Sequence, residues 1–231
     1  MWSGLVTMYN HIISFISIVL LPIYSYFDMK HLKANQTSIQ KITSYIKMML
    51  ILCTISFIVL ISVPQYHFLS NLELKKMSKI ITYAPYIYFF IFSFLPLLLL
   101  FFPKFRMLVN KEVVTTRLFI FPITRTETLW FILFAIIVSI SEELIYRYFL
   151  PYYLHKLFPD ITLLLLITLS SAIFAIIHYL QGFGGILNQF FVATSLCVIF
   201  FSINSLPLII LIHFLLDIKI LIIIRFSGIK Q

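Results

Sequence analysis

The chain has 231 residues, of which 61% are hydrophobic and only 11% are charged, and its mean hydropathy is +1.06. A soluble domain is usually about 25% charged and at most about half apolar. A soluble fold of this length has too little interior to bury so many apolar side chains. The composition therefore excludes an ordinary soluble domain and predicts an integral membrane protein, in which the bilayer covers the apolar surface.

Seven apolar segments are long enough to cross a bilayer, since a helix needs about 20 apolar residues to span about 30 Å of hydrocarbon. They are 10–27, 46–66, 80–102, 128–150, 161–180, 184–203 and 206–225. Backbone polar groups must be satisfied inside lipid and the runs are too long for barrel strands. We therefore expect an all-α, polytopic transmembrane helix bundle of about seven spans.

Two segments of the first half need a separate interpretation. The first lysine is Lys30, so the basic start of a cleavable signal peptide is missing and we expect 10–27 to be a retained span. The segment 112–123 is too short to span, and we expect it to lie along the interface or to dip into the membrane.

The net charge of +9 comes from basic residues that lie mainly in short polar segments between apolar runs. They form no basic face with an aromatic platform, so we expect contacts with anionic lipid and no nucleic-acid binding. With seven spans, eleven of them share one side of the membrane: Lys30, Lys33, Lys41, Lys47, Lys104, Arg106, Lys111, Arg117, Arg125, Arg225 and Lys230. Four lie on the other side: Lys75, Lys76, Lys79 and Lys156. This asymmetry predicts a multi-pass protein of the cell membrane with its N-terminus outside and its C-terminus in the cytoplasm.

The two parts of the chain differ in where they carry ionisable residues. Residues 1–125 hold three predicted N-terminal spans and the interfacial segment, whereas 126–231 hold four predicted spans that include buried charge. The ionisable residues in these spans include Glu142, Glu143, Arg147, His178, His213 and Asp217. Each charge at membrane depth costs about 2.5–3.5 kcal/mol on insertion scales. We therefore expect these side chains to face the bundle interior, to pair, and to mark a functional site.

The spacing of these residues supports pairing. Glu143 and Arg147 are four apart and share a helix face, so they can form an ion pair, while Glu142 is turned about 100° away. His213 and Asp217 are also four apart, so the carboxylate can hold the imidazole. The alternative interpretation is structural. Such side chains also form hydrogen bonds or ion pairs that hold helices together, and those near the end of a span can reach the headgroups.

Three short motifs follow one another on successive predicted spans. They are EExxxR at 142–147, FxxxH at 174–178 and HxxxD at 213–217, and the last is preceded by Asn-Ser-Leu-Pro at 204–207. In this order they resemble the motifs of the CPBP intramembrane proteases, which include the Rce1-type CAAX endopeptidases and bacteriocin-processing or self-immunity proteins. The resemblance covers about residues 125–220. Asp217 stands where many members of the family have asparagine.

The resemblance implies an intramembrane endopeptidase that cleaves membrane-embedded or lipidated peptides. In that interpretation Glu142 is the base that activates water, and His178 positions the water or the glutamate. His213 and Asp217 stabilise the oxyanion of the tetrahedral intermediate or fix the substrate. Three residues are expected to support the site: Glu143, Arg147 and Phe174.

The resemblance requires no metal or other cofactor, because a glutamate-type mechanism accounts for the motifs. The motif HExxH is missing from the sequence. If a metal such as zinc were bound, its ligands would come from separate helices. They would be Glu142, Glu143, His178 and His213.

One geometric condition follows from the predicted spans. Glu142 lies past the middle of the fourth span and His178 lies near the far end of the fifth. Straight antiparallel helices at equal depth would hold the two about 15 Å apart along the axis. A shared site therefore requires a displaced or broken helix, for which Pro151 and Pro159 offer a cause.

Two other functions fit the same residues. A catalytically silent member of the fold could act as a membrane scaffold or regulator, for example by binding a sensor kinase or conferring bacteriocin immunity. A small proton-coupled transporter would also use inward carboxylates and histidines. That function predicts a water path and repeat symmetry between the halves, and no internal repeat is visible in the sequence.

Overall fold

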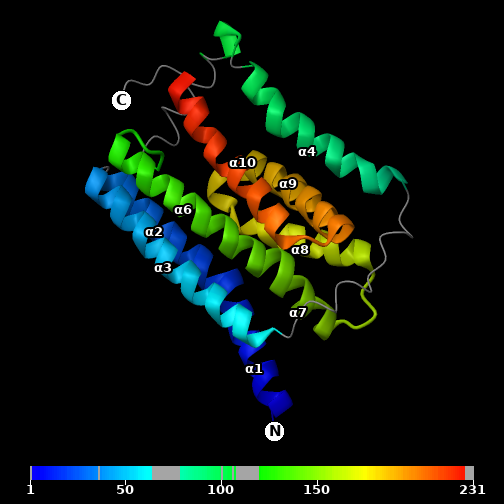
Figure 1. Cartoon of the computed structure of the whole chain (residues 1–231). Helices are drawn as coiled ribbons and strands as arrows, with labels where there is room; N and C mark the ends of the chain where they lie inside the picture. The colour runs from blue at the N-terminus through cyan, green and yellow to red at the C-terminus, as the bar shows by residue number, and fades with distance from the viewer. Residues whose placement is uncertain are drawn as a thin grey trace.

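The computed structural model describes residues 2–35, 37–63, 79–99, 101–105, 107 and 120–226, and it is a bundle of helices (Figure 1). No strand occurs among these residues. The first part contains α1 (Trp2–Phe15), α2 (Leu21–Asn35), α3 (Ser38–Ser62) and α4 (Lys79–Leu99). The second part contains α6 (Arg125–Glu143), α7 (Leu150–Leu157), α8 (Leu163–Ile177), α9 (Gly182–Ile203) and α10 (Leu206–Phe226).

Five helical segments are long and apolar enough to cross a membrane: Met8–Ala34, Ser38–Ser62, Arg125–Leu157, Tyr179–Ile203 and Leu206–Arg225. The shorter apolar helix α8 joins them. The predicted helical membrane bundle is therefore confirmed, while the number of spans and the division near residue 125 stay predictions. Of the expected interfacial segment 112–123, residues 112–119 lie outside the described part of the chain.

Several helix boundaries follow from local sequence. Thr37 and Thr124 each form a capping box with the residue three positions later, and these boxes start α3 and α6. The hydroxyl of Thr162 accepts a hydrogen bond from the backbone N–H of Leu165 at the start of α8. Asn204 adopts the left-handed conformation (φ 55°) that ends α9, and α10 begins directly after Ser205.

Two prolines coincide with widened turns inside long helices. The π-helix Ile16–Leu20 joins α1 to α2 and ends two residues before Pro22. The π-helix Leu144–Phe149 joins α6 to α7 and ends two residues before Pro151. Proline lacks the N–H of the regular ladder and clashes with the carbonyl four residues earlier. The residue just before each proline instead bonds to a carbonyl five residues back. Each helix therefore continues through its proline and changes the face that it presents.

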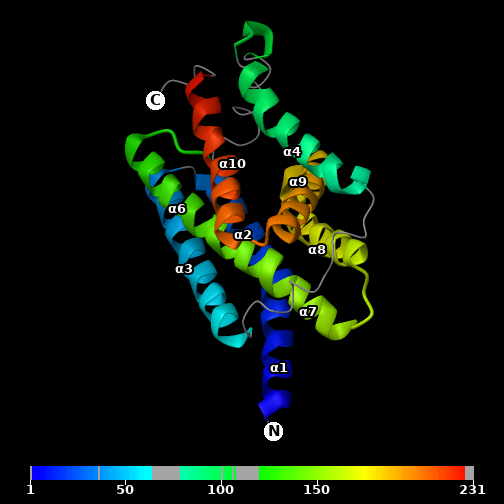
Figure 2. The ribbon, with the colours of Figure 1, turned by 45° about the vertical axis from the view of Figure 1, so that its right-hand side comes forward.

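The helices pack so that the two parts of the chain share one interior. α3 runs along α6, α6 contacts α10, and α8 and α4 both pack on α9 (Figures 1 and 2). The start of α1 and the end of α10 lie at opposite ends of the bundle (Figures 1 and 2). The orientation with the N-terminus outside stays a prediction.

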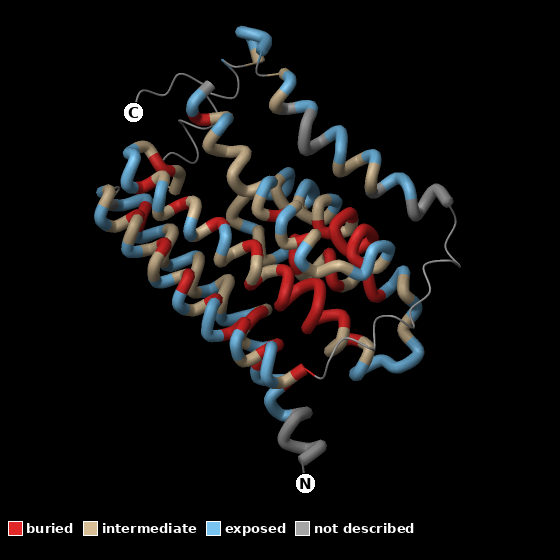
Figure 3. Tube along the Cα trace, in the orientation of Figure 1, coloured by how far each residue is buried: buried red, intermediate tan, exposed pale blue. Residues whose placement is uncertain are grey.

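Burial is greatest where α6 passes into α7. Every residue from Glu143 to Pro151 is buried, and so is the run 195–200 of α9 (Figure 3). Large apolar side chains such as Phe57 and Leu60 lie on the outer surface, which is the expected distribution for a protein surrounded by lipid. Glu143 and Arg147 are thus placed in the best-packed part of the molecule, whereas Glu142, His178 and Asp217 are partly exposed.

A buried ion pair joins the first part of the chain to α6. Lys41 Nζ lies 3.6 Å from Glu127 Oε2, and both side chains are 3% exposed. Lys41 Nζ also donates a hydrogen bond to the carbonyl of Phe121 at 3.1 Å, and the hydroxyl of Ser38 donates one to Glu127. Lys41, counted above only among the topology signals, therefore also fixes α3 against the start of α6.

Candidate active site

The carboxylate of Glu143 connects two other charged side chains. Its Oε2 lies 3.1 Å from Nε of Arg147, and its Oε1 lies 2.5 Å from Nδ1 of His213. A carboxylate only accepts hydrogen bonds, so Nδ1 of His213 is the donor. Glu143 and Arg147 are 0% and 1% exposed. The ion pair expected from the four-residue spacing is therefore present, and the side chain that orients His213 is Glu143 on another helix.

The other ring nitrogen of His213 lies between two further carboxylates. Nε2 is 3.6 Å from Oε2 of Glu142 and 3.7 Å from Oδ2 of Asp217. Both distances are longer than a hydrogen bond, so these are ionic contacts. The hydroxyl of Ser139 lies 3.5 Å from the same oxygen of Asp217. Asp217 thus approaches His213 as its spacing predicts, but more loosely than Glu143 does.

His178 is oriented by its own helix. Its Nδ1 donates a hydrogen bond of 2.8 Å to the carbonyl of Phe174, which leaves Nε2 of a neutral ring as an acceptor. The ring of Phe174 lies 4.6 Å from the ring of His178 and 4.3 Å from the guanidinium carbon of Arg147. Phe174 also contacts the ring of His213 edge to face. One aromatic ring therefore packs against a member of each sequence motif.

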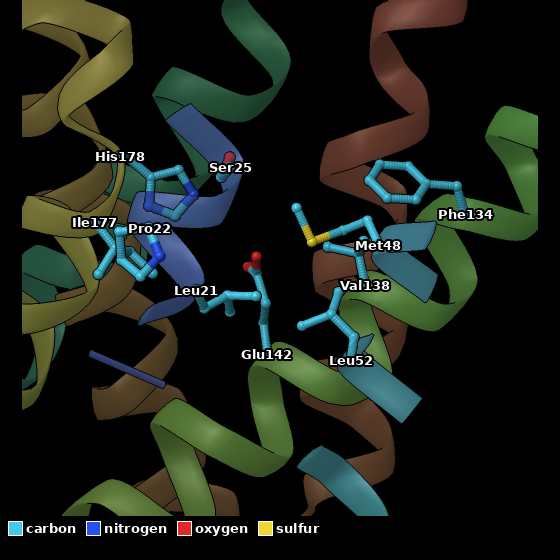
Figure 4. Close-up of a pocket in the computed structure, with 10 residues that line it drawn as sticks. All are labelled: Leu21, Pro22, Ser25, Met48, Leu52, Phe134, Val138, Glu142, Ile177 and His178. Atoms are coloured by element: carbon cyan, nitrogen blue, oxygen red, sulfur yellow. The ribbon is translucent and has the colours of Figure 1, made fainter. Parts of the chain in front are cut away.

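A cavity of about 170 Å³ opens beside these groups. The carboxylate of Glu142 points into it from α6, and His178 faces it from the end of α8 (Figure 4). The remaining lining residues are Leu21, Pro22, Ser25, Met48, Leu52, Phe134, Val138 and Ile177. Residues of α2 and α3 therefore form one wall of the cavity that the two motif residues share.

The depths of Glu142 and His178 match because the helices differ in length from the predicted spans. The helix that begins as α6 continues through the π-helix Leu144–Phe149 to Leu157, and α8 begins only at Leu163. Glu142 lies fifteen positions before Leu157, and His178 lies fifteen positions after Leu163, which is about 22 Å along either axis. The predicted ends at 150 and 161 caused the apparent offset, and the helix is not broken at Pro151 but continues through a π-helical stretch.

The four possible zinc ligands do not form a metal site as they are arranged. In the described part of the chain, no group of three or more His, Cys, Asp or Glu side chains is placed to hold a metal ion. Both oxygens of Glu143 are engaged by Arg147 and His213, and Nδ1 of His178 is engaged by a carbonyl. The arrangement instead offers a carboxylate and an imidazole that face a cavity.

Sequence reasoning missed the contribution of the first part of the chain to the cavity. Ser25 and Met48 lie in segments that hydropathy alone marks as spans, and helix packing determines that they line the cavity. Ser25, a polar residue between apolar neighbours, is the one local signal. Ser139 gave a similar signal, one turn before Glu142 on the same helix face.

Residues 124–218 match the family model of the type II CAAX prenyl endopeptidase Rce1-like proteins. This segment contains all six motif residues described above and excludes α1 to α4. The match confirms the resemblance seen in the three motifs, and it covers the second part of the chain only. No curated protein and no solved structure gives a significant match to the chain.

The two adjacent glutamates should differ in their effect on stability. Glu143→Gln leaves the buried guanidinium of Arg147 without its carboxylate, and we expect a loss of about 3–5 kcal/mol in the free energy of unfolding. Glu142→Gln changes a carboxylate on the cavity wall, and we expect a loss of about 1 kcal/mol. Thermal unfolding of both variants in detergent measures the difference. Equal losses would contradict the structural role of Glu143.

Proposed function

We propose that the protein is an intramembrane endopeptidase in which Glu142 activates water to hydrolyse peptide bonds of hydrophobic, membrane-embedded or lipidated substrates. The supporting observation is that Glu142 and His178, which both belong to the segment that matches the Rce1-like family, face one cavity. The biological role that we propose for this cleavage is peptide maturation or bacteriocin self-immunity.

In the proposed reaction Glu142 takes a proton from a water molecule as the water oxygen bonds to the carbonyl carbon of the substrate. The same proton then passes to the amide nitrogen, and the carbon–nitrogen bond breaks to give a carboxylic acid, which retains the other proton of the water, and an amine. His178 assists by orientation: since its Nδ1 donates to a carbonyl, its Nε2 accepts a hydrogen bond from the attacking water. A water held by both groups is positioned before the substrate arrives.

His213 and Asp217 are proposed to act on the developing negative charge. A protonated His213 places its positive charge within 3.6 Å of Glu142, beside the position where the oxyanion would form. Asp217 then acts through His213, because an ionised carboxylate would itself repel the oxyanion. Glu143 and Arg147 hold this imidazole in place and take no part in proton transfer.

A second candidate, a catalytically silent scaffold of the same fold, is favoured by the contacts of His213. One ring nitrogen donates to Glu143, and the other lies near two carboxylates that would compete with an oxyanion. The two candidates differ in what a Glu142→Gln strain does: a scaffold keeps its cellular phenotype, whereas an endopeptidase loses it.

Removal of the proposed base should abolish cleavage without unfolding the protein. We expect Glu142→Gln to lower the rate by about 10²–10⁴-fold, the usual contribution of general acid–base catalysis. The measurement uses purified protein in vesicles with a panel of hydrophobic and prenylated peptides, and mass spectrometry detects the products. Addition of a chelator should leave the wild-type rate unchanged. Equal rates for the variant and the wild type would contradict the proposal.

The wall formed by α3 should control substrate binding. Met48→Trp fills the cavity, and we expect it to lower kcat/KM by more than about ten-fold for peptides that bind there. Leu50→Trp is the matched control, because Leu50 lies on the same helix with 65% of its surface exposed. Both variants are tested with the same peptides. A cavity that does not bind substrate would give two variants of equal activity.

A further inference from the structure

α10 presents one face to the candidate active site and another to a second cavity, and the sequence motifs account only for the first face. His213 and Asp217 face α6 and the candidate active site. A different stripe of the helix lines a second cavity of about 260 Å³ between α4 and α10. The lining residues are Phe89, Leu97, Ile212, Leu215, Leu216, Ile218, Lys219 and Ile222.

Lys219 is the one charged side chain among these described lining residues. It stands two positions after Asp217, about 200° around the helix, and the two charges interact electrostatically without forming a direct ion pair. A charge inside hydrocarbon costs about 2.5–3.5 kcal/mol. In the described part of the chain the structure records no ion pair within 4 Å for its ammonium group. An apolar cavity with one cation suits a ligand that has an apolar chain and an anionic group.

The position of the cavity indicates which amphiphile fits. The ends of α4 and α10 rise to the same end of the bundle, and the end of α10 extends beyond the start of α6 (Figures 1 and 2). Lys219 stands seven residues before Phe226, about 10 Å along the axis. Two further basic residues follow: Arg225 in the last turn of α10, and Lys104 five residues after the end of α4. The apolar walls thus lead towards a basic end of the protein, where we expect the headgroups of the bilayer to lie.

We propose that the cavity between α4 and α10 binds an anionic phospholipid. One acyl chain packs against Phe89, Leu97 and Leu215, and the headgroup phosphate pairs with Lys219. The attraction between ammonium and phosphate is stronger in a medium of low dielectric constant than in water. A zwitterionic lipid has the same chains but no net negative charge, so it binds less tightly.

The test compares lipid binding by the 231-residue chain and four variants. Delipidated protein in detergent is mixed with phosphatidylglycerol or phosphatidylcholine of identical acyl chains, and native mass spectrometry counts the bound lipids. Lys219→Gln removes the charge, Lys219→Arg keeps it, and Lys156→Gln removes the same charge from α7. Thermal unfolding confirms that each variant is folded.

We expect wild type, Lys219→Arg and Lys156→Gln to bind phosphatidylglycerol in preference to phosphatidylcholine, and Lys219→Gln to bind it about five-fold less tightly. Leu215→Trp, which fills the apolar part of the cavity, should also weaken binding. Unchanged binding in Lys219→Gln, or equal binding of both lipids by the wild type, overturns the proposal. So does a dimer that Leu215→Trp dissociates, because the occupant would then be a second copy of the chain.

Discussion

The site depends on the position of one carboxylate, that of Glu143. Its two oxygens engage Arg147 on the adjoining π-helical turn and His213 on α10, so one side chain joins two of the three motifs. Phe174 adds the third, since its ring lies against Arg147 and next to His178. Buried charges are retained only when they are paired, and this chain of contacts pairs the groups that stay in the interior. Glu142 is thereby left to face the cavity.

The prolines determine how these groups reach a common depth. Pro151 follows a π-helical stretch through which α6 continues into α7. The helix therefore extends to Leu157, and the turn that leads into α8 lies farther from Glu142 than the predicted spans placed it. His178 therefore ends α8 level with Glu142. Pro22 follows the corresponding stretch of the first helix and itself lines the cavity. Widened helical turns of this kind are frequent at functional sites, and here they adjoin both walls of the cavity.

Contacts within one helix could be predicted from the sequence, and contacts between helices mostly could not. The pair of Glu143 with Arg147 follows from a four-residue spacing, and the helices follow from runs of apolar residues. The orientation of His213 by Glu143 depends on how α10 packs on α6, and Met48 reaches the cavity only because α3 packs on α6. Lys219 was overlooked because a single charge does not interrupt an apolar run. The convergence of the motifs on one site could be expected from the family resemblance, whereas the cavity wall formed by α2 and α3 lies outside the matched segment.

Water access to the cavity beside Glu142 is the most direct test of a hydrolytic site inside the membrane. Val138 lines the cavity, and Leu133 lies on the same helix with 44% of its surface exposed on the outer side. In a chain with Cys53→Ala, we compare Val138→Cys with Leu133→Cys in membrane vesicles, using a charged thiol reagent that reacts only with hydrated thiolates. We predict fast labelling at position 138 and little at position 133. An unreactive thiol at position 138 would show a dry interior and contradict the hydrolytic site.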